Sequence, residues 1–116
     1  MLMLIGLAVA ALHPAAPGLR AEDRDAIVKS VKYQLKDPDS AKFKFPEPIG
    51  SKIYCGWVNS RNSYGGLTGF EVFEVPIFEF QGRLVPGGAS FDVDYGPNQH
   101  QVEKECRAAG YIEPVE

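Results

Sequence analysis

The hydrophobic positions of residues 22–36 repeat with the period of a helix. Ile27, Val31 and Leu35 are four residues apart, while the lysines of the segment point elsewhere. Acidic side chains lie at the start of the segment and Lys36 lies at its end, which matches the helix dipole. This pattern predicts one amphipathic helix over residues 22–36.

The segment after this helix predicts a short helical restart followed by a strand. Asp37 can cap a new turn, and Pro38 suits the first helical position because its missing N–H would be unpaired there anyway. Phe43 and Phe45 then alternate with lysines. This alternation predicts a half-buried strand that ends in the proline-rich segment after it.

From residue 53 the hydrophobic period changes to two. Ile53, Cys55 and Trp57 fall on one face of the expected strand, and the residues between them fall on the other face. The next apolar run, residues 67–80, has glutamates at spacings that strict alternation forbids. The spacing predicts a bulge near residues 72–73 and a second break near 76–78.

Turn-forming residues divide the following segment into two shorter strands. Gln81 and Gly82 predict a tight turn, and residues 83–85 predict a return strand. A second turn is expected at residues 86–88. Apolar and acidic residues alternate over 91–95, which predicts a last strand with one face in water.

The C-terminal part predicts a helix that carries the second cysteine. Residues 98–101 are typical of a capping box, and Gly110 suits the left-handed position that ends a helix. Cys106 lies on the stripe of this helix that faces the sheet, and Cys55 points into the same interior. A Cys55–Cys106 disulfide is therefore predicted. The alternative is a pair of buried free thiols in a cytosolic protein.

The order of these elements predicts an α+β domain. It would have an N-terminal helix, an antiparallel meander of four to five strands, and a C-terminal helix packed on one face of the sheet, the same face that the first helix covers. Residues 19–116 are enough for a single domain with one core, and a disulfide would strengthen so small a core.

Residues 1–18 predict a signal peptide. The apolar run 2–12 is shorter than the roughly 20 residues that span a bilayer, and Ala16 and Gly18 form a cleavage pattern. The run is preceded by no Lys or Arg, so a wrongly chosen start codon or an uncleaved anchor remains an alternative. The mature protein is expected in the periplasm or secreted, and not integral to the membrane after signal removal.

Two sequence blocks resemble a family of small exported proteobacterial proteins of unknown function. The blocks are LKDPDSAKF, residues 35–43, and CGWVNSRNSYGGLTGF, residues 55–70. The resemblance implies an exported, compact domain. It implies no activity and no catalytic residue.

The polar block 59–66 is the candidate binding loop. Its amide, guanidinium and phenol groups would surround a notch lined by glycine, which a ligand could approach. The residues concerned are Asn59, Arg61, Asn62, Tyr64, Gly65 and Gly66. The alternative is that the same residues only build a long turn, because Asn and Gly favour turns.

The sequence contains few of the residues that catalytic or metal sites require. After signal removal His100 is the sole histidine, so a zinc site or a Ser-His-Asp triad lacks partners. A calcium loop is partly matched by Asp92, Asp94, Asn98 and Glu103, but it fails at Gly96 and Pro97. We expect no cofactor and no metal.

The function expected from these patterns is non-enzymatic binding. The net charge of −3 argues against nucleic acid as the partner, and an envelope protein or polymer is expected instead. One alternative is a hydrolase of envelope polymers with two carboxylates chosen from Glu71, Glu74, Glu79, Asp92 and Asp94. Another is a structural subunit that assembles by strand-edge pairing.

Overall fold

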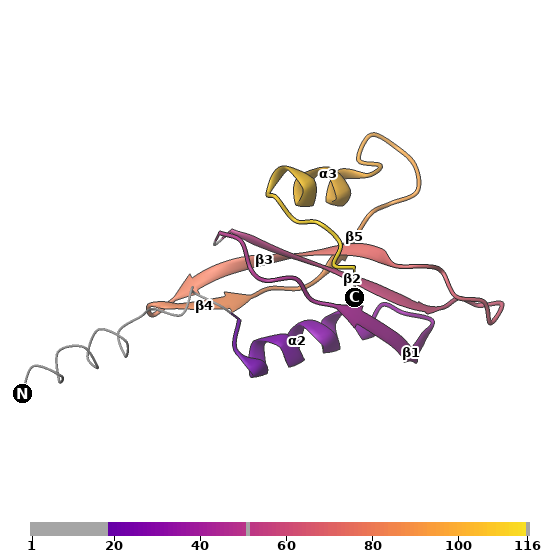
Figure 1. Ribbon diagram of the computed structural model, residues 1–116, viewed down its shortest axis with the longest axis horizontal. Coiled ribbons are helices and arrows are strands. Elements are labelled where there is room, and N and C mark those ends of the chain that lie inside the picture. The colour runs from indigo at the N-terminus through magenta and orange to yellow at the C-terminus, as the bar shows by residue number, and fades with distance from the viewer. Residues whose placement is uncertain (1–18, 51, 116) are drawn as a thin grey trace, which may run out of the picture.

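The computed structural model describes residues 19–50 and 52–115 as an antiparallel sheet with a helix on each side (Figure 1). The elements are α2 (Ala21–Lys32), β1 (Asp37–Lys44), β2 (Ile53–Arg61), β3 (Glu71–Phe80), β4 (Arg83–Pro86), β5 (Ser90–Phe91) and α3 (Gln101–Ala108). The strands follow the order β1-β2-β3-β4, and β5 also pairs with β3. The predicted α+β meander is confirmed, whereas the predicted signal peptide, residues 1–18, lies outside the described residues.

Helix α2 is shorter than the sequence predicts, because it ends at Lys32 and not at residue 36. Its last turn tightens, since Gln34 N donates to Val31 O at 2.9 Å. Ile27 and Val31 are fully buried, and Leu35 still packs against the core from the segment after the helix. The predicted apolar stripe is therefore correct, although its last member is no longer helical.

The helical restart predicted after α2 is wrong, because residues 37–44 form strand β1. The pairing of β1 with β2 shifts register between Asp37 and Lys42. Ser40 lies in this irregular stretch, where its hydroxyl accepts from Arg61 N at 2.9 Å and donates to Asp37 O at 2.7 Å. A side chain thus supplies contacts that a regular ladder would make with its backbone.

Strand β3 is regular throughout, so the two breaks predicted in it are wrong. It pairs with β2 from Glu71 to Pro76 and with β4 from Ile77 to Phe80, each without a register shift. The predicted turn at Gln81 and Gly82 is confirmed, and both residues have positive φ. The predicted last strand is reduced to β5, because the chain leaves the sheet after Phe91.

The two helices lie on opposite faces of the sheet, which corrects the prediction that they share one face (Figure 1). Cys55 and Trp57 belong to the face under α3, and Tyr54 and Val58 belong to the face over α2. All four side chains are buried, because β2 is covered on both sides. Such a strand cannot show a clean hydrophobic-polar alternation.

The predicted disulfide between Cys55 and Cys106 is present, with a Cα–Cα distance of 6.0 Å. It fastens the middle of β2 to the buried side of α3, next to Val102. Gly110 adopts the predicted left-handed conformation, with φ of +99°. The disulfide and the buried ring of Tyr111 hold α3 and the segment after it over the sheet.

Candidate functional site

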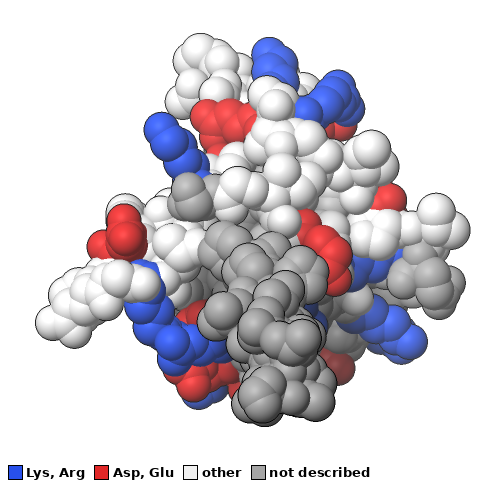
Figure 2. All heavy atoms as spheres, turned by 60° about the vertical axis from the view of Figure 1, so that its left-hand side comes forward, with Lys and Arg blue, Asp and Glu red and all other residues white. Residues whose placement is uncertain are grey.

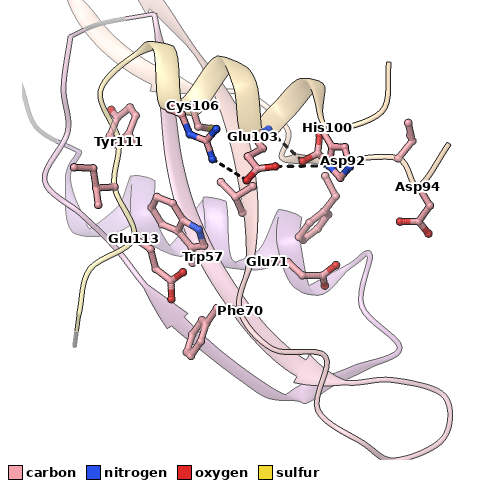
Figure 3. Close-up of a pocket in the computed structure, with 15 residues that line it drawn as sticks. Trp57, Phe70, Glu71, Asp92, Asp94, His100, Glu103, Cys106, Tyr111 and Glu113 are labelled. Carbon is pink, nitrogen blue, oxygen red and sulfur yellow. Dashed lines mark hydrogen bonds and ion pairs between the residues drawn. The ribbon is translucent and has the colours of Figure 1, made fainter. Parts of the chain in front are cut away.

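A cleft of about 710 Å³ opens between α3 and the sheet face that it covers (Figure 3). Its floor is apolar and comes from β2, β3, β5 and the residue before β3. The floor residues are Trp57, Phe70, Val72 and Phe91. One wall is α3 with the segment that follows it, and the opposite wall is the segment 91–94. Elements far apart in the sequence therefore meet around one hollow.

The lining of the cleft is acidic. It contains the carboxylates of Glu71, Asp92, Asp94, Glu103 and Glu113, and Arg107 is the only Lys or Arg among the lining residues. Two of these acids have basic partners, because Glu103 binds Arg107 at 3.0 Å and Glu113 binds Lys44 at 2.9 Å. The other three make no ion pair within residues 19–50 and 52–115. Carboxylates without a basic side-chain partner thus gather where the segment 92–94 faces the start of β3.

Asp92 has a structural task as well, because its carboxylate caps α3. Oδ1 accepts from Val102 N at 2.6 Å, and Oδ2 accepts from Glu103 N at 3.1 Å. These donors belong to the first turn of the helix and have no partner within it. The capping box predicted over residues 98–101 is wrong, since the preceding residue His100 makes no side-chain cap and has a positive φ of 63°.

Glu71 lies at the start of β3 on the rim of the cleft. Burial is the main reason why the pKa of its carboxyl is raised, and the nearby charge of Asp94 raises it further. A hydrogen bond with Thr68 opposes both effects. A carboxyl whose pKa is raised by burial and by a neighbouring charge, and which lies in a cleft, is a candidate for a functional group.

A second carboxylate pair lies beneath α3, beside the disulfide. Burial, together with a hydrogen bond to Glu105 and its charge, raises the pKa of Glu74 to about 7. The pKa of Glu105 is lowered by that same hydrogen bond and by one from Gln101. Glu74 pairs with Cys55 across the strands, so this shared proton sits at the contact between the sheet and α3.

The predicted binding loop lies outside this cleft, and several of its polar groups form hydrogen bonds within the loop itself. The side-chain oxygen of Asn62 accepts from Tyr64 N at 2.9 Å and from Gly66 N at 3.1 Å. Asn59 holds the far side of the loop by accepting from Gly69 N at 3.0 Å. The guanidinium of Arg61 bonds to Gly65 O at 3.4 Å, and the ring of Tyr64 is 96% exposed.

The fold brings three of the five acids considered for paired-carboxylate chemistry to one cleft and places the other two elsewhere. Glu71, Asp92 and Asp94 line the cleft, Glu74 pairs with Glu105, and Glu79 is exposed on the strand toward β4. The four residues of the calcium-like pattern also divide. Asp92 and Glu103 come together with His100, and the nearest ligand atoms of these three lie within 4.8 Å of one another.

Several cleft residues had no local signal in the sequence. Phe70, Arg107 and Glu113 enter the cleft only because α3 folds back over β2 and β3. The predicted position of Trp57 beside Cys55 was the one available signal, since it placed an aromatic ring under the last helix. That ring is 9% exposed, so it is mostly core and only its surface reaches the cleft.

Comparison with protein-family models, curated proteins and solved structures gave no significant match. The resemblance of the two sequence blocks therefore stays a prediction. Within the described ranges, no helix combines the length and the hydropathy required to cross a membrane.

Proposed function

We propose that this protein is a non-enzymatic binding module of the cell envelope and that the cleft under α3 is its binding site. One observation carries the proposal: an aromatic floor lies beside Glu71, Asp92 and Asp94, three carboxylates without a basic partner in the described part of the chain. A few polar groups placed around an apolar hollow are typical of a ligand site.

The ligand that fits this lining carries a positive charge on an apolar body. An amine or guanidinium would be attracted by the acidic end of the cleft, where field lines converge. Aliphatic or ring carbons would then cover Phe70 and Phe91 on the floor. Lys44 already makes such a contact, because its Nζ lies 4.3 Å from the centre of the Phe70 ring and bonds to Glu113.

An envelope location is supported by the disulfide and by the predicted signal peptide. Disulfides persist in oxidising compartments outside the cytoplasm. Nucleic acid is a poor partner, because the net charge is −3 and the face drawn in Figure 2 mixes basic and acidic side chains without a broad basic surface. The envelope partner is expected to present its cationic group to the cleft.

Trp57 provides the readout for a test, because it is the only tryptophan and it lines the cleft. The peptide Lys-Ala-Lys should change its fluorescence in a saturable way, and Glu-Ala-Glu should not. The response should weaken at high salt, which screens exposed charges.

The variants for this test change carboxylates inside and outside the cleft. Glu71→Gln combined with Asp94→Asn should remove the response to Lys-Ala-Lys, and Glu79→Gln should leave it unchanged because Glu79 lies outside the cleft. An equal response in all three proteins would refute the assignment of the cleft.

The loop 59–66 remains a proposed second contact with the partner. Asn62 is unsuitable for testing this, since its side chain holds the turn together. Arg61→Ala combined with Tyr64→Ala removes two side chains that project from the loop and should leave the fold intact. If capture of the partner from envelope extract is unchanged in this variant, the loop is not a contact.

A hydrolase is the second candidate, and the raised pKa of Glu71 beside Asp94 favours it. A carboxyl with a raised pKa beside a second carboxylate is the arrangement of a general acid and its partner. The protein would then release new chain ends from purified cell-wall polymer, and Glu71→Gln would abolish the release. No release above the level of this variant would exclude this chemistry.

Strand-edge assembly has less support. The edge strand β1 carries Pro38 and two lysines, and β4 is short and ends at Pro86. Charge, proline and shortness are the features that protect sheet edges from pairing.

A further inference from the structure

We propose that Asp92, His100 and Glu103 bind a single divalent transition-metal ion of the zinc type at the edge of the cleft. Figure 3 shows the three side chains gathered at the start of α3. One ligand atom from each lies within 4.8 Å of the other two. Nothing in the function proposed above requires this metal.

The distances suit the size of such an ion. Zinc ligands at about 2.0–2.2 Å in tetrahedral geometry are roughly 3.4 Å apart. His100 Nδ1 and Glu103 Oε1 are already 3.6 Å apart. They come from positions i and i+3, which lie on the same side of a helical turn. Asp92 reaches the same point from the segment after β5, so closing the site needs only small side-chain movements.

Both carboxylates are held by groups that leave lone pairs free. Each oxygen of Asp92 accepts one backbone N–H, from Val102 and Glu103, and each retains capacity for a metal. Glu103 uses Oε2 for Arg107 at 3.0 Å, while Oε1 faces His100. Ligands oriented by such outer hydrogen bonds are the rule in protein metal sites.

The backbone of His100 is held in an uncommon conformation that aims its ring at this point. Its φ of 63° lies in the left-handed region, which few residues other than glycine adopt, although histidine is enriched there together with asparagine and aspartate. The ring is well exposed, with 60% of the side chain accessible, so an ion can reach it from solvent.

The ligand set selects the class of ion. Calcium and magnesium take oxygen ligands, whereas an imidazole nitrogen suits zinc, copper, nickel or iron. Three protein ligands leave a fourth position open, as in zinc sites that hold a water or a substrate. The positive end of α3 opposes a cation, but the Asp92 carboxylate caps it, and Glu71 and Asp94 add negative charge in the same cleft.

The test is zinc binding by the full chain after removal of bound metal with a chelator. Titration of ZnCl₂ against a chromophoric competitor should show one equivalent bound per chain. His100→Gly should weaken binding at least about tenfold, the usual minimum cost of disturbing a metal site. Glycine accepts the left-handed backbone without strain, so this variant should fold as well as the parent.

The matched control is Glu79→Gln, which removes an exposed carboxylate outside the cleft and should leave the zinc affinity unchanged. Glu103→Gln should weaken binding like His100→Gly, because it removes the carboxylate ligand. It should keep the local structure, because the glutamine oxygen can still accept from Arg107. Equal affinity in the parent and in His100→Gly would overturn the proposal. Displacement of zinc by an equal concentration of CaCl₂ would also overturn it, because a site with an imidazole ligand disfavours calcium. Either result leaves the peptide test of the cleft unaffected.

Discussion

Reduction of the Cys55–Cys106 disulfide should lower the stability of the domain substantially. The bond joins β2 to α3 across 51 residues of sequence. Opening a loop of that length returns conformational entropy to the unfolded chain, worth about 4 kcal/mol in the chain-entropy model. Whole domains of this size are typically stable by only about 5–15 kcal/mol, so the loss would be a large fraction of the total.

The effect is measurable as a change in melting temperature. In a domain of this size, 1 kcal/mol shifts the midpoint by about 4–8 °C, so the full loss would shift it by roughly 15–30 °C. Calorimetry with and without reductant gives the comparison directly. Cys55→Ala combined with Cys106→Ala provides the control, because its midpoint should be low and should not respond to reductant.

The same experiment separates a global effect from detachment of α3 alone. Besides the disulfide, this helix is held by Val102, by the ring of Tyr111 after it, by the Asp92 cap and by the hydrogen bond between Glu74 and Glu105. If α3 detaches locally, amide hydrogen exchange should rise over residues 101–111 before the sheet unfolds. Equal midpoints and equal exchange in oxidised and reduced protein would refute the reasoning.

Three further predictions concern single side chains. Because the pKa of Glu74 is raised to about 7, the folded state retains a proton that the unfolded chain loses near pH 4.5. The free energy of unfolding should therefore fall as the pH rises from 4.5 to about 7. Denaturant titrations should show this fall as about 1 kcal/mol, after allowance for solvent screening, and Glu74→Gln should remove it. An unchanged pH dependence in that variant would contradict the shared proton. Gly56→Ala would place a methyl 2.5 Å from the Phe73 ring and should cost about 1–3 kcal/mol in thermal unfolding; a neutral result would mean that the ring moves freely. Asp92→Ala should cost about 1–2 kcal/mol by uncapping α3, whereas Asp94→Ala should cost little, and equal melting of the two variants would argue against the cap.

The parts of the fold that sequence could predict are those with a local period. Spacing within one segment predicts three features: the stripe containing Ile27 and Val31, the two faces of β2, and the turn at Gln81. The disulfide followed as well, because the direction of Cys55 in its strand and that of Cys106 in its helix were each set by a local period.

The parts that sequence could not predict depend on contacts between distant segments. Asp92 caps a helix that begins nine residues later, and no local pattern distinguishes it from a solvated acid of a strand. Ser40 completes an irregular ladder only because Arg61 lies opposite. The cleft depends on α3 returning over the sheet on the face away from α2, which the continuous burial of residues 54–58 explains only after the fold is known.

The placement of the helices on opposite faces separates two demands on the sheet. The side toward α2 is filled by tightly packed residues such as Phe73 and Val75, which tolerate little change. The side toward α3 is anchored by one covalent bond and leaves much of its surface around an open hollow. Ligand preference can therefore change by substitution on one side while the packed core on the other side stays constant, and related chains should diverge most at the residues that line the hollow.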